Sequence, residues 1–581
     1  MEKFLKNSKN KPIAIFVDSK ITTYAPTNLP NQKEFAKILI KTLYDKVPNS
    51  LQRIPIKLSL KTVSKIIYEE IGSIYFEVLK CFYNADINQI HIKLAKMLVK
   101  KRIRVIINTG MDNCLELALK NEGLKRDIDF LVLTKDEEFD CWPFKHDKPV
   151  IIKLGGDSTD PKCIKESLDM YNEGMGKHKV NLLSYILMNY YNIFLGIDTV
   201  FPYLHHYVLE SVPCSCPGIT FVGDDKKIIE DINNAIKLYE REINIINSKE
   251  SDFLEELCKK FGLYFPIKRL VDQKIQHLEK LAQWEKKLTP FLSCKVLAAM
   301  LSKIGEDNLA FKYRKKSLDI ATEEDNKLHV AEILISIALE NYYSKRDDSL
   351  KKYENAIGIL EELGKYDRIA KAYLSIGEVC LGQHHFHLAL NYFKSALDIY
   401  RKDGSKSKIA LVYSKLGKVY EDQQDFKDAL DFYNKSLEYY QELDAIAKTG
   451  KAYNNIARTH FHEDMNKAKI YYCKAQEYAW ESGDIETIAR IYSNLAVIAH
   501  KEDDMVRAQR LYWRSGVILG RIGKYREAAA VYYNLALLKK SCNQMSKAKK
   551  YVNRGIKLYK NENKDKNYFK LTEFLSQIDN G

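Results

Sequence analysis

The sequence lacks the features that mark secreted, disulfide-bonded and zinc-binding proteins. Its eleven cysteines are scattered singly, apart from Cys214 and Cys216, and form no Cys-x-x-Cys pair or His/Cys cluster at zinc-ligand spacing. We therefore expect reduced thiols, no metal ion and a cytoplasmic protein. Residues 1–12 are charged and contain no apolar run, so they do not have the form of a secretory signal.

Two further absences concern membranes and histidine sites. Residues 180–197 are uncharged and long enough to cross a membrane, but asparagines, a serine and a glycine interrupt them. A buried helix that leads into a buried strand explains this stretch better, so we expect a soluble protein. The histidines that occur close together have no further ligands at metal spacing, and we interpret them as surface or hairpin-loop residues. They are His205 and His206, and the trio His384, His385 and His387.

The net charge of +15 is modest for 581 residues. It is compatible with an acidic partner, with nucleic acid, or with a lysine-rich background, and we favour the first and last of these. The basic run from Lys100 to Arg104 follows a predicted helix, where cations complement the helix dipole and are usually solvated. We therefore do not expect nucleic acid as the partner.

What the sequence does contain is a repeat with a step of 39 or 40 residues. Each copy has an aromatic, an aliphatic and a small residue on a first helix, and an alanine on a second helix. The clearest first helices carry Tyr373-Ile376-Gly377, Tyr413-Leu416-Gly417, Tyr453-Ile456-Ala457, Tyr492-Leu495-Ala496 and Tyr532-Leu535-Ala536. The alanines of the second helices are Ala389, Ala429, Ala468, Ala508 and Ala548. Weaker copies extend the pattern backwards, which predicts about seven helical hairpins over residues 289–562.

These copies resemble the tetratricopeptide repeat, although they lack its tryptophan and proline and exceed its usual length of about 34 residues. Stacked hairpins share a continuous core, so the resemblance implies a curved solenoid with a concave face. We expect a fragment that begins near Thr289 to fold alone. A last helix within residues 563–581, which carries Tyr568, Leu571, Phe574 and Leu575, is predicted to cap the open end.

The concave face is the candidate binding site of this half. Residues two positions after each signature aromatic lie about 200° around the helix from it, away from the core. They are Ser375, Lys415, Asn455, Asn494 and Asn534, and the same face carries Lys371, Lys451, Arg458 and Arg490. In related repeat proteins, asparagines on this face bind the backbone of an extended peptide, which implies an extended or acidic partner. The alternative is an inner surface that is merely solvated.

The first half alternates short apolar runs with amphipathic stretches. The pattern predicts strands at residues 13–17, 104–107, 130–133, 150–154, 193–196 and 219–222, and helices at 32–44 and 87–99. Such alternation indicates a Rossmann-like α/β domain with a parallel sheet over residues 1–225. A helical insertion is expected at about residues 55–85 and a helical linker at 226–288.

Loop sequences after the strands resemble those of sirtuin-like domains, the silent-information-regulator type found in prokaryotic defence proteins. The likeness spans roughly residues 10 to 225 and includes Asn88, Ile90 and His91 before the second strand and Asp112 and Glu116 after it. Further matches are Gly156 and Asp157 after the fourth strand, and Pro26, Leu29 and Pro30 after the first. The resemblance implies a degenerate NAD pocket formed by Lys20, Thr22, Asp112, Gly156, Asp157 and Gly196.

The positions that act chemically in that family are changed here. Asp18, Ser19 and Lys20 stand where the family has Gly-Ala-Gly, Gly110 stands for its ribose-binding asparagine, and Gly155 stands for its catalytic histidine. A glycine offers no side chain to position a water or accept a proton. We therefore name no catalytic residue and expect no cofactor. Asp112 and Asp157 have a second interpretation, in which each only caps a helix or turn.

Two functions follow from these observations. The favoured one is a protein-interaction scaffold whose solenoid binds a peptide or protein, with a pseudoenzyme-like sirtuin domain as docking or regulatory module. The alternative is an NAD hydrolase or deacylase in antiviral defence, which would bind NAD.

Overall fold

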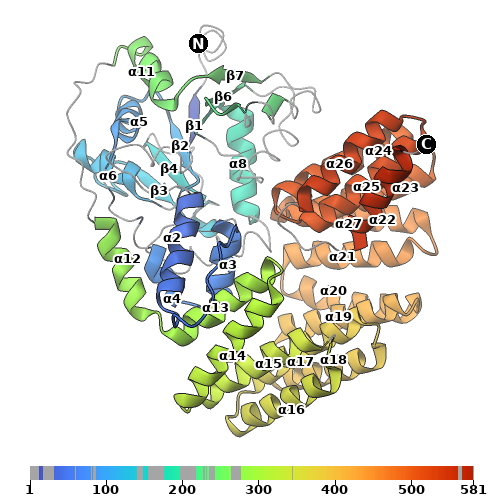
Figure 1. Cartoon of the computed structure of the whole chain (residues 1–581). Coiled ribbons are helices and arrows are strands. Elements are labelled where there is room, and N and C mark those ends of the chain that lie inside the picture. The colour runs from blue at the N-terminus through green and yellow to red at the C-terminus, as the bar shows by residue number, and fades with distance from the viewer. Residues whose placement is uncertain are drawn as a thin grey trace. The chain divides into compact units, whose positions relative to one another are not determined.

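The structure of the chain is a computed structural model, and it describes residues 12–17, 32–58, 60–79, 82, 85, 87–110, 112–139, 148–154, 176–196, 217–226, 229, 232–233, 243–263, 276–342, 344–559 and 566–579. Its contacts divide the chain into two compact units (Figure 1). The first comprises Met1–Leu39 with Ser59–Lys287, and the second comprises Ile40–Leu58 with Leu288–Gly581. Multidomain organisation is therefore confirmed.

A seven-stranded sheet forms the centre of the first unit. The strands are β1 Ile13–Val17, β2 Val105–Asn108, β3 Leu131–Leu133, β4 Val150–Lys153, β5 Tyr191–Leu195, β6 Ile219–Gly223 and β7 Asn244–Asn247. They lie in the order β3-β4-β2-β1-β5-β6-β7, and every pair is parallel. Val17 at the end of β1 pairs with Asn108 and with Leu195, so these three strands end level. The predicted Rossmann-like parallel sheet is confirmed.

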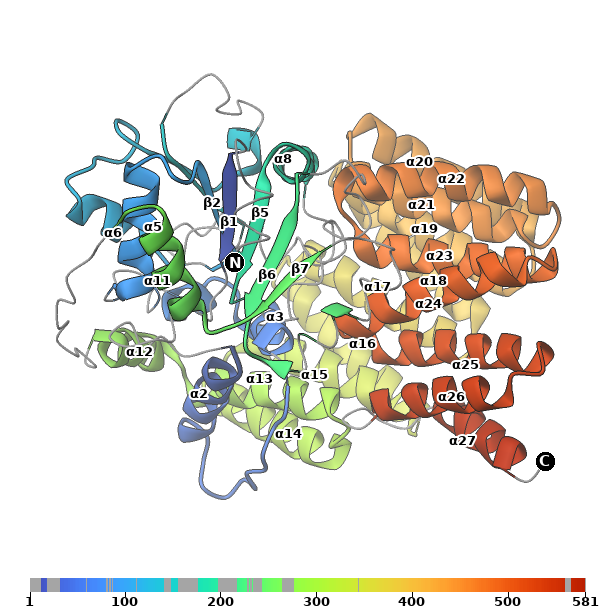
Figure 2. The same cartoon turned by 90° about the horizontal axis from the view of Figure 1, so that it is seen from above.

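Helices cover both faces of this sheet. Helices α5 Gln89–Val99, α6 Cys114–Asn121 and α11 Glu250–Lys260 pack against one face, and α8 Lys177–Asn189 lies on the other (Figures 1 and 2). Ile13, Ile15 and Val17 of β1 point into the first layer. On the opposite face, Phe194 stacks between Phe16 and Phe221, with ring centroids 4.3 and 4.7 Å apart. Continuous apolar strands are what a doubly covered parallel sheet requires.

The described residues of the first half contain five further elements. They are α2 Gln32–Asp45, α3 Leu60–Ile71, α4 Ile74–Leu79, the 3₁₀ helix η3 Asp136–Phe139 and α12 Gln276–Lys287. Helices α3 and α4 occupy the region predicted as a helical insertion. The segment 226–288, predicted as a helical linker, instead contributes β7 to the sheet and α11 to its covering layer. Asn244 and Asn247 flank only two isoleucines in β7, and this short polar strand gives no alternation to recognise.

Fourteen helices form seven consecutive hairpins in the described part of the second unit. They are α13 Pro290–Lys303, α14 Asp307–Glu323, α15 Lys327–Asn341, α16 Arg346–Glu362, α17 Tyr366–Gly382, α18 Phe386–Lys402, α19 Lys406–Asp422, α20 Phe426–Glu442, α21 Ile446–His460, α22 Met465–Ser482, α23 Ile485–Lys501, α24 Met505–Arg521, α25 Tyr525–Ser541 and α26 Met545–Leu558. The hairpins stack in chain order (Figure 2). The all-helical repeat solenoid is confirmed.

The repeat signature is explained by close packing inside each hairpin. The five marker alanines of the second helices are fully buried, and the signature tyrosines from Tyr413 onwards are buried. A side chain at Gly417 would place its Cβ 2.8 Å from the Tyr433 ring, so the first helix approaches the second only with a small residue there. The small residue of the signature therefore permits the close approach of the two helices, and the alanine and tyrosine fill the core between them.

Each end of the repeat array is covered by a further segment. Helix α27 Lys566–Asp579 packs Leu571 and Phe574 against α25 and α26, where the capping helix was predicted. At the other end, the Tyr313 hydroxyl of α14 donates to the Gln52 carbonyl at 3.0 Å, and the Tyr44 ring meets that of Tyr313.

In the residues that the structure describes, no helix combines the length and apolar content needed to cross a membrane.

Candidate functional site

The first helices of four consecutive hairpins, α19, α21, α23 and α25, line a cavity of about 660 Å³. Seven of the nine residues predicted from the helix face line it: Lys415, Lys451, Asn455, Arg458, Arg490, Asn494 and Asn534. The other two, Ser375 and Lys371, lie on α17 outside this cavity, and Lys371 pairs with Asp367 of its own helix at 2.7 Å. The helical spacing thus brings residues about 40 positions apart into one site, which we call the groove.

Amide side chains occur at the same place in three successive hairpins of the groove. Asn455 donates to the Ser414 hydroxyl, and Asn494 donates to the amide oxygen of Asn454, both over 3.4 Å. Bonds of this length are weak, and both residues line the cavity. Asn534 makes no side-chain hydrogen bond within the described residues. The groove therefore offers both donors and acceptors in register.

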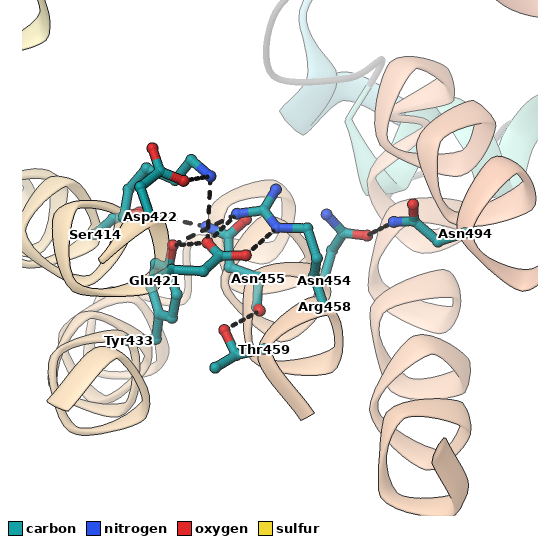
Figure 3. Close-up of polar contacts among 10 residues, drawn as sticks. Ser414, Glu421, Asp422, Tyr433, Asn454, Asn455, Arg458, Thr459 and Asn494 are labelled. Carbon is teal, nitrogen blue, oxygen red and sulfur yellow. Dashed lines mark hydrogen bonds and ion pairs between the residues drawn. The ribbon is translucent and has the colours of Figure 1, made fainter. Parts of the chain in front are cut away.

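Arg458, which lines the groove, is held by a buried carboxylate (Figure 3). Its Nε and Nη2 donate to the two oxygens of Glu421, each over 2.6 Å, and the Tyr433 hydroxyl donates to Glu421 Oε2 at 2.8 Å. Burial alone would raise the pKa of Glu421, but hydrogen bonds and charge from Arg458 outweigh it and lower that pKa. Arg458 thus ties α21 to α19.

Three other cations of the groove are paired with carboxylates of neighbouring hairpins, and a fourth, Lys448, donates to the Ser407 hydroxyl at 3.3 Å. The pairs are Lys415–Glu378 (2.6 Å), Lys451–Asp484 (3.2 Å) and Arg490–Glu527 (2.9 Å). Arg490 further binds Glu486 at 2.8 Å, and Lys524 binds the same carboxylate at 3.0 Å. The positive charge of the groove is therefore largely balanced by carboxylates, while its amides are not satisfied in the same way.

Sequence reasoning did not find these carboxylates or the second row of polar side chains. Ser414, Asn454, Thr487, Ser493 and Glu527 also line the cavity. The carboxylates had a readable signal, because Glu421–Arg458 and Arg490–Glu527 each join residues 37 positions apart. A separation of 37 residues equals one repeat minus about one helical turn. It places the later residue beside its partner on the first helix of the preceding hairpin.

The sheet-end site predicted in the first unit is described only in part. Lys20, Thr22, Gly156 and Asp157 lie outside the described residues, as do Asp18 and Gly155. Gly196 follows β5 and adjoins a small cavity of about 20 Å³ with Gly223 and Glu250. Asp112 lies in the loop after β2, where its Oδ1 accepts the backbone N–H of Cys114 at 3.0 Å. Asp112 thus caps the turn that leads into α6, whose N-cap residue is Asn113.

Gly110 and Asp112 occupy one small space. A Cβ at Gly110 would lie 2.7 Å from Asp112 Oδ2, so this carboxylate fills the room that a side chain at 110 would need. Asn108, at the end of β2, accepts the Gly110 N–H at 2.8 Å and holds the turn. An asparagine at position 110 would have to displace the Asp112 carboxylate.

A buried polar cluster adjoins Asp112. His91 Nδ1 accepts the backbone N–H of Asn88 at 3.1 Å, while the Asn88 side chain caps α5. Burial lowers the His91 pKa to about 4, although the charge of Asp112 opposes this. The His91, Asp112 and Cys114 side chains offer ligand atoms within 4.8 Å of one another. Because Nδ1 accepts a hydrogen bond, the neutral ring carries its proton on Nε2 and has no lone pair there for a metal ion.

A buried ion pair completes this region. Lys153, the last residue of β4, lies 3.1 Å from Glu116 on α6, and both side chains are buried. Burial raises the Glu116 pKa more than the nearby Lys153 lowers it. Sequence reasoning noted Glu116 but missed Lys153, whose only signal is a lysine that ends an otherwise apolar strand. The pair joins β4 to α6 and offers no solvent-facing group.

Comparisons with known proteins support the repeat assignment. The family model "Tetratricopeptide repeat" matches residues 408–479 and a second model of that description matches 529–562, while "Soluble NSF attachment protein, SNAP" matches 310–416. The predicted tetratricopeptide repeats are confirmed. No curated protein matches the chain at a significant level.

Three solved structures match the chain at low identity and low TM-score. A signal transduction ATPase with a tetratricopeptide repeat sensor from Pyrococcus horikoshii is 14% identical, with 100% of this chain and 91% of that chain covered and a TM-score of 0.36. Aspartyl phosphate phosphatase F from Bacillus subtilis is 14% identical (58% and 88% covered, TM-score 0.36). The quorum sensor NprR from B. thuringiensis is 15% identical (47% and 76% covered, TM-score 0.33). At these TM-scores the structures do not decide between functions.

Proposed function

We propose that the chain is an interaction protein whose groove binds an extended segment of a protein partner. The observation that carries this proposal is the set of amides Asn455, Asn494 and Asn534, at equivalent positions of three hairpins and facing one cavity. A backbone in extended conformation presents a donor and an acceptor at each residue, and it needs neutral groups of both kinds opposite it. Side-chain amides supply both.

The size and lining of the cavity suit such a segment. Leu411, Ala452 and Val531 give the groove apolar surface between the amides, as a bound side chain would require. Neighbouring first helices of packed hairpins lie roughly 10 Å apart, and an extended chain advances about 3.3 Å per residue, so equivalent amides would meet every third residue. The paired cations position the amides and the walls, and they give an acidic segment only a weak advantage.

Replacing the three asparagines by alanine is expected to weaken binding at least about tenfold, because each lost hydrogen bond costs about 0.5–1.5 kcal/mol. A displayed library of random peptides, selected on the full chain, supplies the ligands, and titration calorimetry of the enriched peptides measures affinity. Three exposed asparagines on second helices, Asn391, Asn434 and Asn466, give a matched control when replaced by alanine. Equal binding by both triple variants would rule out the groove as the site.

For the first unit we propose a docking or regulatory role rather than turnover of NAD. Gly110 supports this, because it lacks the amide that the sirtuin resemblance implies and its space is taken by the Asp112 carboxylate. Without that amide, a ribose bound at the sheet end would have no group at position 110 to orient it.

We expect the purified chain to release no nicotinamide from NAD above a heat-denatured control. The double variant Gly110→Asn with Gly155→His should not gain activity, because the added amide collides with Asp112 and several groups of a coupled site would still be missing. Chromatographic detection of nicotinamide, with and without a groove-binding peptide, makes the measurement. Release by the unmodified chain would instead favour the NAD-consuming alternative.

A further inference from the structure

Two second helices carry an excess of positive charge. Helices α24 and α26 together carry nine Lys/Arg residues and no Asp or Glu, whereas the chain as a whole has a net charge of +15. This differs from the groove, where carboxylates of adjacent hairpins pair with the cations. A local excess of this size attracts polyanions and is not explained by the packing of the repeats.

The cations of α24 and α26 are in register. Each helix has a basic residue at its third, sixth and tenth positions: Arg507, Arg510 and Arg514 on α24, and Lys547, Lys550 and Arg554 on α26. At 100° per residue these positions fall within a sector of about 60°, so each helix has a single basic row. The helices are neighbours, because a Cβ at Gly520 of α24 would lie 3.9 Å from Leu558 of α26.

Part of each row has a structural role and part does not. Arg514 lies over the Tyr492 ring at 5.9 Å and Arg554 over the Tyr532 ring at 5.2 Å, so both cover signature tyrosines. Arg507, Arg510, Lys547 and Lys550 are exposed, and none of them makes an ion pair with another described residue. These four exposed side chains of the two basic rows are available to a partner.

We propose that the basic rows bind an acidic amphipathic helix of a protein partner. Carboxylates spaced at i, i+3 and i+4 on such a helix recur every 5–6 Å or so, which matches the steps of about 4.5 and 6 Å within each row. The exposed apolar side chain beside the α24 row, Val506 at 73% exposure, suits an amphipathic helix better than a phosphate backbone. No exposed aromatic ring lies on the described residues of α24 or α26 to stack a nucleic-acid base.

The test uses three labelled probes on the full-length chain. They are a synthetic amphipathic helix with glutamates along one face, the same peptide with glutamine in their place, and a DNA duplex of mixed sequence. Fluorescence anisotropy should show binding of the glutamate peptide and little binding of the glutamine peptide. Replacing Arg507, Arg510, Lys547 and Lys550 by glutamine should weaken binding of the glutamate peptide at least about tenfold. Each exposed ion pair contributes modestly, but four contributions are lost together.

A matched variant removes the same charge elsewhere in the array. The exposed lysines Lys351, Lys365, Lys402 and Lys427 are replaced by glutamine, which leaves the basic rows intact. Its affinity for the glutamate peptide should stay within about twofold of the parent, because screening confines the effect to nearby charges. Equal losses in both variants, or no binding of the glutamate peptide, would overturn the proposal. Binding of the duplex alone, abolished in the first variant, would replace it with a nucleic-acid surface.

Discussion

Arg458→Met is expected to lower the free energy of unfolding of the repeat unit by about 3 kcal/mol, because it leaves the buried Glu421 carboxylate without its cation. Both hydrogen bonds of 2.6 Å are lost, while the Tyr433 hydroxyl and Lys418, at 3.5 Å, retain some contact with the carboxylate. Hydrogen exchange of α19 to α21, combined with urea unfolding, measures the loss. Adding Glu421→Gln should recover part of it by removing the buried charge.

The pH dependence distinguishes this mechanism from a simple packing defect. In the parent chain the Glu421 pKa lies below its ordinary value, so its contribution is present above about pH 4.5 and is lost as the pH falls. In Arg458→Met, burial is opposed only by Lys418 and Tyr433 and raises the Glu421 pKa. Acidification toward pH 5 then protonates the carboxylate and narrows the stability difference between variant and parent. A difference that stays constant from pH 7 to about pH 5 would contradict the buried charge as its cause.

An exposed pair gives the control. Lys435 and Asp431 lie 3.0 Å apart on the exposed surface of α20, the helix whose Tyr433 belongs to the buried network. Lys435→Met should change stability by less than about 1 kcal/mol, because solvent screens such a pair. A loss as large as that of Arg458→Met would mean that burial of Glu421 is not the source of the effect.

The fold could be predicted from sequence wherever a period was strong. Buried strands such as Ile13–Val17 and the repeated tyrosines gave patterns long or frequent enough to recognise, and both halves were assigned correctly. Strand β7 was missed because it adds only two isoleucines at the edge of the sheet. Edge strands are held by one neighbour and need little apolar surface, so their sequence carries a weak signal.

The groove could be predicted from one helix face, but its electrostatics could not. The 100° step placed Asn455, Asn494 and Asn534 on the concave side without knowledge of how hairpins pack. Charge balance depends on which residues of adjacent first helices meet, and that is set by the shift of one helical turn between them. The cations of the groove, considered alone, suggest an acidic ligand. Because Glu421 and Glu527 pair with two of these cations, the groove instead suggests a neutral ligand.

A fragment that contains residues 288–581 alone is expected to be about 5 kcal/mol less stable than one that also carries residues 40–58. This revises the prediction that an array beginning near Thr289 folds by itself, because the structure groups Ile40–Leu58 with the repeats. Val47 and Ile56 are buried, and the Tyr44 hydroxyl donates to the Ile54 carbonyl at 2.9 Å, which closes the segment on itself. Exposing two or three such side chains costs about 1.5–3 kcal/mol each.

Three fragments test this expectation: 288–581 alone, the same fragment with residues 40–58 joined to its start by a flexible glycine-serine linker, and one joined to a scrambled 40–58 sequence. Thermal unfolding and size-exclusion chromatography should show a monodisperse, more stable protein only with the native segment.

Tyr313→Phe in the fused fragment removes only the hydrogen bond from the Tyr313 hydroxyl to Gln52 and should lower stability by about 1 kcal/mol. Terminal repeats need a cover for their apolar face, and the α27 end already has one. If the uncovered fragment matches the fused one in melting temperature and remains monomeric, α13 and α14 cover that end without help from residues 40–58.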